Sequence, residues 1–172
     1  PLWSRGLGDV YKRQRLEWVV IDMAIMGIGC ITAPVYASNT EDQVKYIVKH
    51  SESKIVFVED QEQLDKMLTI WGDLPELKKI VVIDKYIPDD LPNVLSIEKF
   101  RELGVSHRSK HNGVFEDKLQ SVKPDDIISF TYTSGTTGNP KAGMFNSTNV
   151  ISVAKSLPDL LPTYRTDLGI SY

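Results

Sequence analysis

Apolar residues along the chain form either short runs, typical of buried strands, or sets at helical spacing. Residues 16–27 are apolar nearly all round, which predicts a buried helix. Residues 54–59 and 79–84 are short runs rich in Ile and Val, which predict buried strands. The runs at 31–36 and 127–130 predict two further strands. The apolar pattern alone therefore outlines a core of short strands separated by longer helical stretches.

The segments between these strands carry helix signals. Thr40 with Gln43 forms a capping box, which predicts a helix with Val44, Ile47 and Val48 on one face. After residues 54–59, large apolar side chains at helical spacing predict a second helix and part of the core: Leu64, Met67, Leu68 and Trp71. Strands that alternate with helices predict an α/β fold, a largely parallel sheet flanked by helices.

The second half of the chain is more polar. Ser96 predicts the cap of a short helix that ends at Gly104, and residues 107–118 predict a surface connection. His107 and His111 lie four apart, but with no third ligand evident the pattern favours a solvated face over a metal pair. His50 is a lone histidine near a helix end and implies no site. Further along, we expect a strand at 143–147, a helix at 148–157 halted by Pro158, and another strand at 168–172.

Residues 1–14 have no periodicity, and we interpret them as a non-native or disordered leader. A membrane span over residues 18–37 has nearly the required length, about 20 residues. Asp22, Gly27, Gly29 and Pro34 interrupt that stretch, and a buried helix followed by a strand explains it better.

The strongest chemical signal is the stretch Tyr-Thr-Ser-Gly-Thr-Thr-Gly-Asn-Pro-Lys at residues 132–141. Gly135 and Gly138 let backbone N–H groups converge on an anion. Nearby Ser and Thr hydroxyls add donors, and Lys141 adds a compact positive charge. A strand that leads into such a loop predicts a cradle for a polyphosphate, so we call residues 132–141 the phosphate loop.

Three better-known loops do not fit. A Walker loop fails because Met144 and Phe145 follow the glycine pair Gly138 and Gly143. A nucleophile elbow at Ser134 lacks its flanking glycines. A dinucleotide fingerprint fails because Thr32 stands where its third glycine belongs. An ordinary Gly/Ser/Thr turn is the remaining alternative.

The full ten-residue string resembles the phosphate-loop signature of the adenylate-forming (AMP-forming) acyl-CoA synthetase superfamily. Residues 15–22 and 29–36 are similar to the upstream region of long-chain fatty acid CoA ligases. The resemblance covers residues 15–172. It implies part of the large N-terminal AMP-binding domain, truncated at its C-terminal end.

In that family ATP and a carboxylic acid form an acyl-adenylate, and the thiol of coenzyme A then displaces AMP. The resemblance implies ATP, Mg²⁺ and coenzyme A as cofactors or co-substrates, with a fatty acid as substrate. It assigns nucleotide binding to Thr133, Ser134, Gly135, Thr136, Thr137, Gly138 and Lys141, and a metal contact to Thr133. No catalytic residue is assigned within these residues, because the family's later motifs and catalytic lysine lie beyond them, and we expect the fragment alone to be inactive.

The chain departs from the family pattern just after the lysine: Ala142 replaces the usual glycine, and Ser147 replaces a common histidine. These departures weaken any inference about the acyl channel. Two alternatives therefore stay open: an adenylating enzyme for another acid, aromatic or amino acid, and a truncated, non-catalytic nucleotide-binding module.

Composition limits the classes of partner and the cellular compartment that we expect for this protein. A length of 172 residues suggests one domain or part of a larger one, and a net charge of −3 gives no basic footprint for nucleic acid. The single cysteine, Cys30, cannot form an internal disulfide, which fits a reducing compartment. We expect a cytoplasmic protein whose parent has possible peripheral contact with membranes and binds small-molecule substrates.

Overall fold

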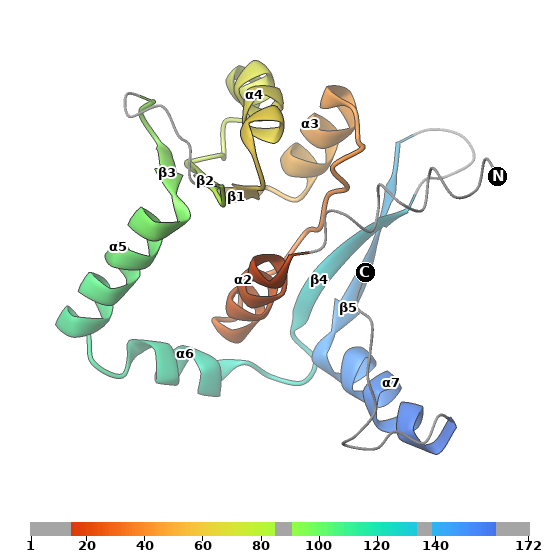
Figure 1. Cartoon of the computed structure of the whole chain (residues 1–172). Helices are drawn as coiled ribbons and strands as arrows, with labels where there is room; N and C mark the ends of the chain where they lie inside the picture. Colours follow the sequence, from red (N-terminus) through yellow and green to blue (C-terminus); the bar gives the residue numbers. More distant parts are fainter. Residues whose placement is uncertain (1–14, 85–90, 134–138, 161–172) are drawn as a thin grey trace.

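The computed structural model describes residues 15–84, 91–133 and 139–160, with side chains described up to residue 156 (Figure 1). The expected leader at 1–14, loop residues 134–138 and the expected strand at 168–172 lie outside the described residues. Those three predictions therefore remain predictions.

The first unit is a three-stranded parallel sheet in the order β1-β2-β3, with bounds Ile55–Val58, Lys79–Val82 and Val94–Ser96 (Figure 1). Helix α3 (Glu41–His50) precedes β1, and helix α4 (Gln61–Ile70) with the short 3-10 helix η1 (Trp71–Asp73) joins β1 to β2. Helix α5 (Ile97–Lys110) follows β3. The predicted α/β class is confirmed, as are the strands at 54–59 and 79–84 to within two residues.

The core lies between this sheet and helices α3 and α4. Leu64 of α4 and Ile80 and Val82 of β2 are completely buried. Val44 and Val48 belong to the same cluster, and the predicted core residues Leu68 and Trp71 pack against it partly buried. The amphipathic faces predicted from the sequence are the faces that the fold buries.

Side-chain caps fix where these helices begin. The predicted capping box is present, because Thr40 Oγ1 accepts from Gln43 N and Gln43 Oε1 accepts from Thr40 N. Asp60 and Ser96 cap α4 and α5 by accepting from the backbone N–H three residues on. Each cap satisfies a donor that has no partner within the helix.

The second unit is an antiparallel hairpin of β4 (Ile127–Thr133) and β5 (Lys141–Asn146), followed by α7 (Ser147–Leu160). The strand expected at 31–36 is reduced to one bridge: Thr32 N donates to Ile128 O, and Phe130 N donates to Thr32 O. That prediction was too long, and Pro34 is a physical reason, since it has no N–H with which to extend a ladder.

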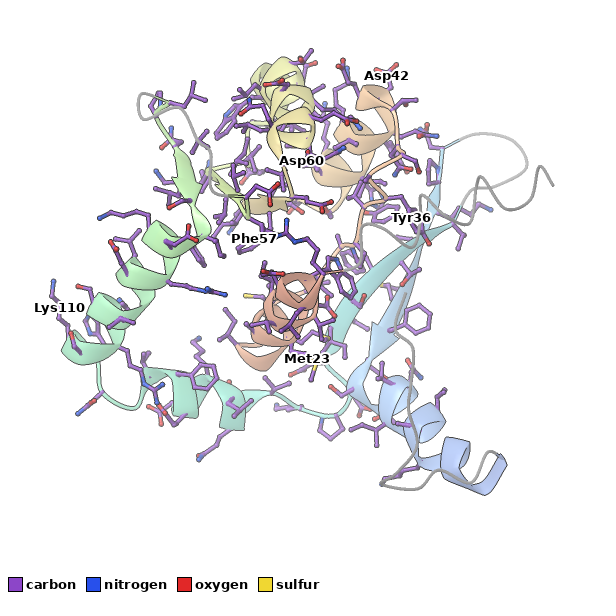
Figure 2. All side chains as sticks on the ribbon, in the orientation of Figure 1. Met23, Tyr36, Asp42, Phe57, Asp60 and Lys110 are labelled. Atoms are coloured by element: carbon purple, nitrogen blue, oxygen red, sulfur yellow. The ribbon has the colours of Figure 1, made fainter. Side chains whose placement is uncertain are left out.

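Helix α2 (Leu16–Gly27) has the predicted bounds, but the prediction that it is buried is wrong for the described residues. None of its side chains is buried, and Met23 is 64% exposed (Figure 2). A helix that is apolar on every side needs neighbours on every side. The described elements do not surround it.

Three boundaries in the polar half also differ from the prediction. Helix α5 does not stop at Gly104 but continues to Lys110, because a single interior glycine costs only about 1 kcal/mol. The connection expected at 107–118 is instead the end of α5 and a separate helix, α6 (Val114–Ser121). Helix α7 does not stop before Pro158 but continues to Leu160.

Candidate functional site

The two described ends of the phosphate loop lie side by side. Strand β4 ends at Thr133 and strand β5 begins at Lys141, and the register pairs these two residues directly. Asn139 and Pro140 are described, whereas Ser134, Gly135, Thr136, Thr137 and Gly138 are not. Of the seven predicted site residues, the structure therefore places two, and it places them opposite each other.

Thr133 and Lys141 share one face of the hairpin. Directly opposed residues in an antiparallel pair have Cβ atoms about 4.5–5.5 Å apart and project to the same side. Both residues are exposed. A hydroxyl and an ammonium are thus available together at the mouth of the loop, a donor set suited to phosphate oxygens.

Tyr132 projects to the other face of the hairpin, because successive strand residues alternate sides. It is 8% exposed, and Ile128 on the same strand is also buried. The first residue of the phosphate loop is therefore anchored inside the protein, while the next residue faces solvent.

The anchor includes a residue that sequence reasoning dismissed. His50, the last residue of α3, has its Nδ1 2.8 Å from the Tyr132 hydroxyl oxygen. Tyr46 completes an aromatic cluster: its ring stacks on His50 at a centroid distance of 5.5 Å and meets Tyr132 edge-on at 6.5 Å. No sequence pattern signalled this contact, because 82 residues separate His50 from Tyr132.

The surroundings of Tyr132 keep its hydroxyl protonated. Burial raises the pKa of Tyr132 above its ordinary value, Tyr46 raises it further, and a hydrogen bond with Ser51 acts in the opposite direction. At neutral pH the hydroxyl is therefore a donor, and it can donate to Nδ1 of a neutral His50 that carries its proton on Nε2.

The two residues that depart from the family pattern, Ala142 and Ser147, lie within regular secondary structure. Ala142 pairs with Tyr132 in the hairpin, and Ser147 is the first residue of α7. A Cβ added at Gly143 would lie 3.5 Å from the Phe145 ring and 3.6 Å from Thr131 O, which is normal contact. Packing among the described residues therefore does not explain the glycine at 143.

A metal ion fits this site only together with phosphate oxygens. The described residues contain no cluster of three or more His, Cys, Asp or Glu side chains that could hold a metal. The Thr133 hydroxyl is a hard oxygen donor of the kind that Mg²⁺ accepts. Lys141 opposite it would repel a bare cation, so anionic phosphate would have to lie between them.

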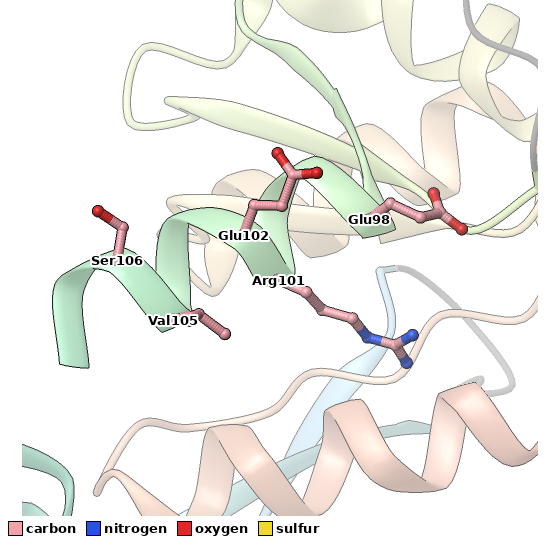
Figure 3. Close-up of a pocket in the computed structure, with 5 residues that line it drawn as sticks. All are labelled: Glu98, Arg101, Glu102, Val105 and Ser106. Atoms are coloured by element: carbon pink, nitrogen blue, oxygen red, sulfur yellow. The ribbon is translucent and has the colours of Figure 1, made fainter. Parts of the chain in front are cut away.

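Other chemical signals in the described part of the chain are weaker. The rings of His107 and His111 lie 4.4 Å apart, but both residues are exposed and gather no third ligand there. A hollow of about 500 Å³ lies along α5, lined by Glu98, Arg101, Glu102, Val105 and Ser106 (Figure 3). One helix supplies all of its lining residues, so it is a surface depression without convergent groups. No helix of the described residues is long and apolar enough to span a bilayer.

Comparison with known sequences identifies relatives. Residues 9–168 match the family model of the AMP-binding enzymes. The chain is 32% identical over 143 residues to the human long-chain-fatty-acid–CoA ligase ACSBG1, covering 81% of this chain and 19% of that protein. It is 27% identical over 154 residues to the Mycobacterium tuberculosis long-chain-fatty-acid–CoA ligase FadD15, covering 90% of this chain and 24% of that protein. The chain thus spans about a fifth to a quarter of the length of these relatives.

Comparison with solved structures gives the same fold. The anthranilate CoA ligase AuaEII in complex with anthranoyl-AMP matches with a TM-score of 0.61 and 25% identity, over 81% of this chain and 24% of that one. Coronafacic acid ligase from Pectobacterium brasiliense matches with a TM-score of 0.62 and 18% identity, over 90% of this chain and 27% of that one. At that lower identity the likeness concerns the fold alone.

Proposed function

Because the chain belongs to the AMP-binding enzyme family, we propose that it is part of an ATP-dependent ligase that activates a long-chain fatty acid and transfers it to coenzyme A. The observation that carries this proposal is the phosphate loop, whose paired ends Thr133 and Lys141 present a hydroxyl and an ammonium on one face. The similarity to fatty acid ligases such as ACSBG1 supports the choice of acid.

The proposed role of the phosphate loop is to stabilise charge on departing pyrophosphate. When the carboxylate attacks the α-phosphorus of ATP, the bond to the β,γ-phosphates breaks and negative charge grows on them. We assign their binding to Thr133, Ser134, Gly135, Thr136, Thr137, Gly138 and Lys141. Donors fixed in advance at that position lower the barrier because they need not reorganise during the reaction.

We assign one residue of this chain, Thr133, to contact Mg²⁺. Bound with ATP, it would supply charge neutralisation at the phosphates. The Thr133 hydroxyl is the group of this chain that we assign to it, since Thr133 is exposed at the end of β4. The role of Lys141 does not depend on that assignment.

Coenzyme A is the proposed acyl acceptor. We further propose that the protein acts in the cytoplasm and meets membranes peripherally, since long-chain fatty acids partition into lipid. A single cysteine fits that compartment.

A second candidate is a ligase for another carboxylic acid. The anthranilate CoA ligase, which matches this chain at 25% identity, supports this candidate. Both candidates share the phosphate loop, so they differ only in the acid.

The test is ATP–pyrophosphate exchange by the full-length protein that carries this chain. Palmitate should support exchange, and anthranilate at the same concentration should not; added coenzyme A should then yield palmitoyl-CoA. Exchange with anthranilate alone would replace the first candidate by the second. ATP binding without exchange for any acid would favour a non-catalytic module.

A further inference from the structure

We propose that His50 is a positioning residue for Thr133 and Lys141, the two described site residues of the phosphate loop, because its hydrogen bond to Tyr132 ties the end of helix α3 to strand β4. The inference rests on the proposed function of the loop as a phosphate cradle. It adds to that site a residue of helix α3, which lies far from the phosphate loop in the sequence.

The first step of the argument is that His50 is itself held in place. Helix α3 begins at the Thr40 capping box and buries Val44, Ile47 and Val48 in the core. The turn that follows it is also bonded, since Ser51 N donates to Ile47 O and Ser51 Oγ to Val48 O. His50 therefore projects from a fixed backbone.

The second step is that Tyr132 sets the direction of the loop. Tyr132 is buried and lies one residue before Thr133. Neighbouring strand residues point to opposite faces, so fixing the Tyr132 ring inside fixes Thr133 on the outer face. Thr133 pairs with Lys141, and the position of the ammonium follows from that pairing.

The third step is that the bond joins two units of the fold. His50 belongs to the packed parallel-sheet unit and Tyr132 to the β4–β5 hairpin. Tyr46, one turn earlier on α3, supports the same junction by packing against both rings. A ring–hydroxyl bond at this point limits rotation of the hairpin end about its own axis.

The link works in both protonation states of the histidine. A neutral His50 accepts from the Tyr132 hydroxyl at Nδ1, and a protonated His50 donates from Nδ1 to the hydroxyl oxygen. The bond can therefore form whichever of the two groups is the donor.

The experiment compares four variants of the full-length protein: His50→Phe, Tyr132→Phe, the double variant, and His50→Asn. Tyr132→Phe keeps the buried ring, and Asn keeps a polar atom close to the Nδ1 position. His107→Phe is the matched control, because His107 is an exposed histidine on α5 whose ring lies against His111 and not against Tyr132. ATP affinity is measured by calorimetry without any acid, and exchange with palmitate is measured separately.

Each single phenylalanine variant should weaken ATP binding about three- to tenfold, the effect of one lost hydrogen bond. The double variant should be no weaker than either single variant, because both remove the same link. His50→Asn should restore most of the affinity, His107→Phe should match wild type, and the KM for palmitate should not change.

Additive losses in the double variant would overturn the proposal, as would single variants that only lower the melting temperature and leave ATP affinity intact. Wild-type protein that binds ATP but exchanges with no acid would refute the proposed ligase activity alone. Wild-type protein that binds no ATP would overturn both.

Discussion

The parallel-sheet unit and the β4–β5 hairpin differ in how they treat their apolar side chains. In the first, α3, α4 and strands β1–β3 enclose one continuous cluster in which Leu64 is completely buried. In the second, the hairpin and its neighbours α2 and α7 leave large apolar side chains exposed, including Leu16 at 77%.

The two regions therefore have different roles: one stabilises the fold, and the other carries the predicted site. Burial of apolar surface is the main stabilising term, at about 25 cal/mol per Å², so the stability of this chain resides mainly in the parallel-sheet unit. The two described site residues, Thr133 and Lys141, lie instead on the hairpin, where exposed donors can meet a ligand. The contact between His50 and Tyr132 connects the two regions.

The largest expected effect compares two leucines, one in each region. Leu64→Ala in the 172-residue chain should lower the free energy of unfolding by about 2–5 kcal/mol, because it leaves a cavity in a closed core. Leu16→Ala should change it by less than about 0.5 kcal/mol, since that side chain is already exposed. Urea denaturation followed by circular dichroism measures both, and equal losses would remove the distinction between the regions.

The second prediction concerns Lys141, whose loss should lower the reaction rate without lowering stability. Lys141→Ala in the full-length protein should slow ATP–pyrophosphate exchange about 10²–10³-fold, the usual effect of losing one preorganised transition-state donor. Its melting temperature should not change, because the side chain is exposed. Lys141→Arg should restore only part of the rate, since a planar guanidinium does not replace a compact ammonium.

Lys155→Ala on α7 is the control for that experiment, an exposed lysine outside the predicted site. A loss of palmitate affinity in Lys141→Ala, with the exchange rate kept, would contradict the role given to the phosphate loop.

The third prediction concerns the cap of the helix that carries His50. Thr40→Ala should cost about 1 kcal/mol of unfolding free energy, because Gln43 N loses its acceptor. Thr69→Ala is the control: Thr69 lies inside α4 and bonds only a carbonyl of its own helix, so its removal should be neutral or slightly stabilising. If both threonines behave alike in urea denaturation, the cap does not stabilise α3.

The smallest expected effect is a pH dependence at Tyr132. Its pKa is raised above the ordinary 10.0, chiefly by burial. Above pH 10 the unfolded chain therefore releases this proton before the folded chain does, and stability falls as pH rises toward the folded pKa. Tyr132→Phe should lose less stability than wild type between neutral pH and pH 11 in urea denaturation; parallel curves would show that Tyr132 does not contribute.

The sequence was most informative where a signal is local. The capping boxes and caps depend on residues three apart, so Thr40 and Ser96 marked helix starts correctly. The short apolar runs of the strands and the helical spacing of Leu64 and Met67 identified the core for the same reason. The ends of helices were less predictable. Gly104, for example, lowers helix stability by only about 1 kcal/mol, and contacts of neighbouring residues can offset that cost.

The sequence by itself predicted strands β1 and β2, the starts of helices α3 and α5, and the core side chains of α3 and α4. It also singled out the ten residues of the predicted phosphate loop, five of which lie outside the described residues. Local backbone preferences and side-chain periodicity carry that information. The tertiary structure decided that Thr133 faces Lys141, that α2 lies exposed among the described elements, and that His50 bonds Tyr132. These facts depend on strand register and on packing between residues far apart in the chain, for which a single sequence contains no local signal.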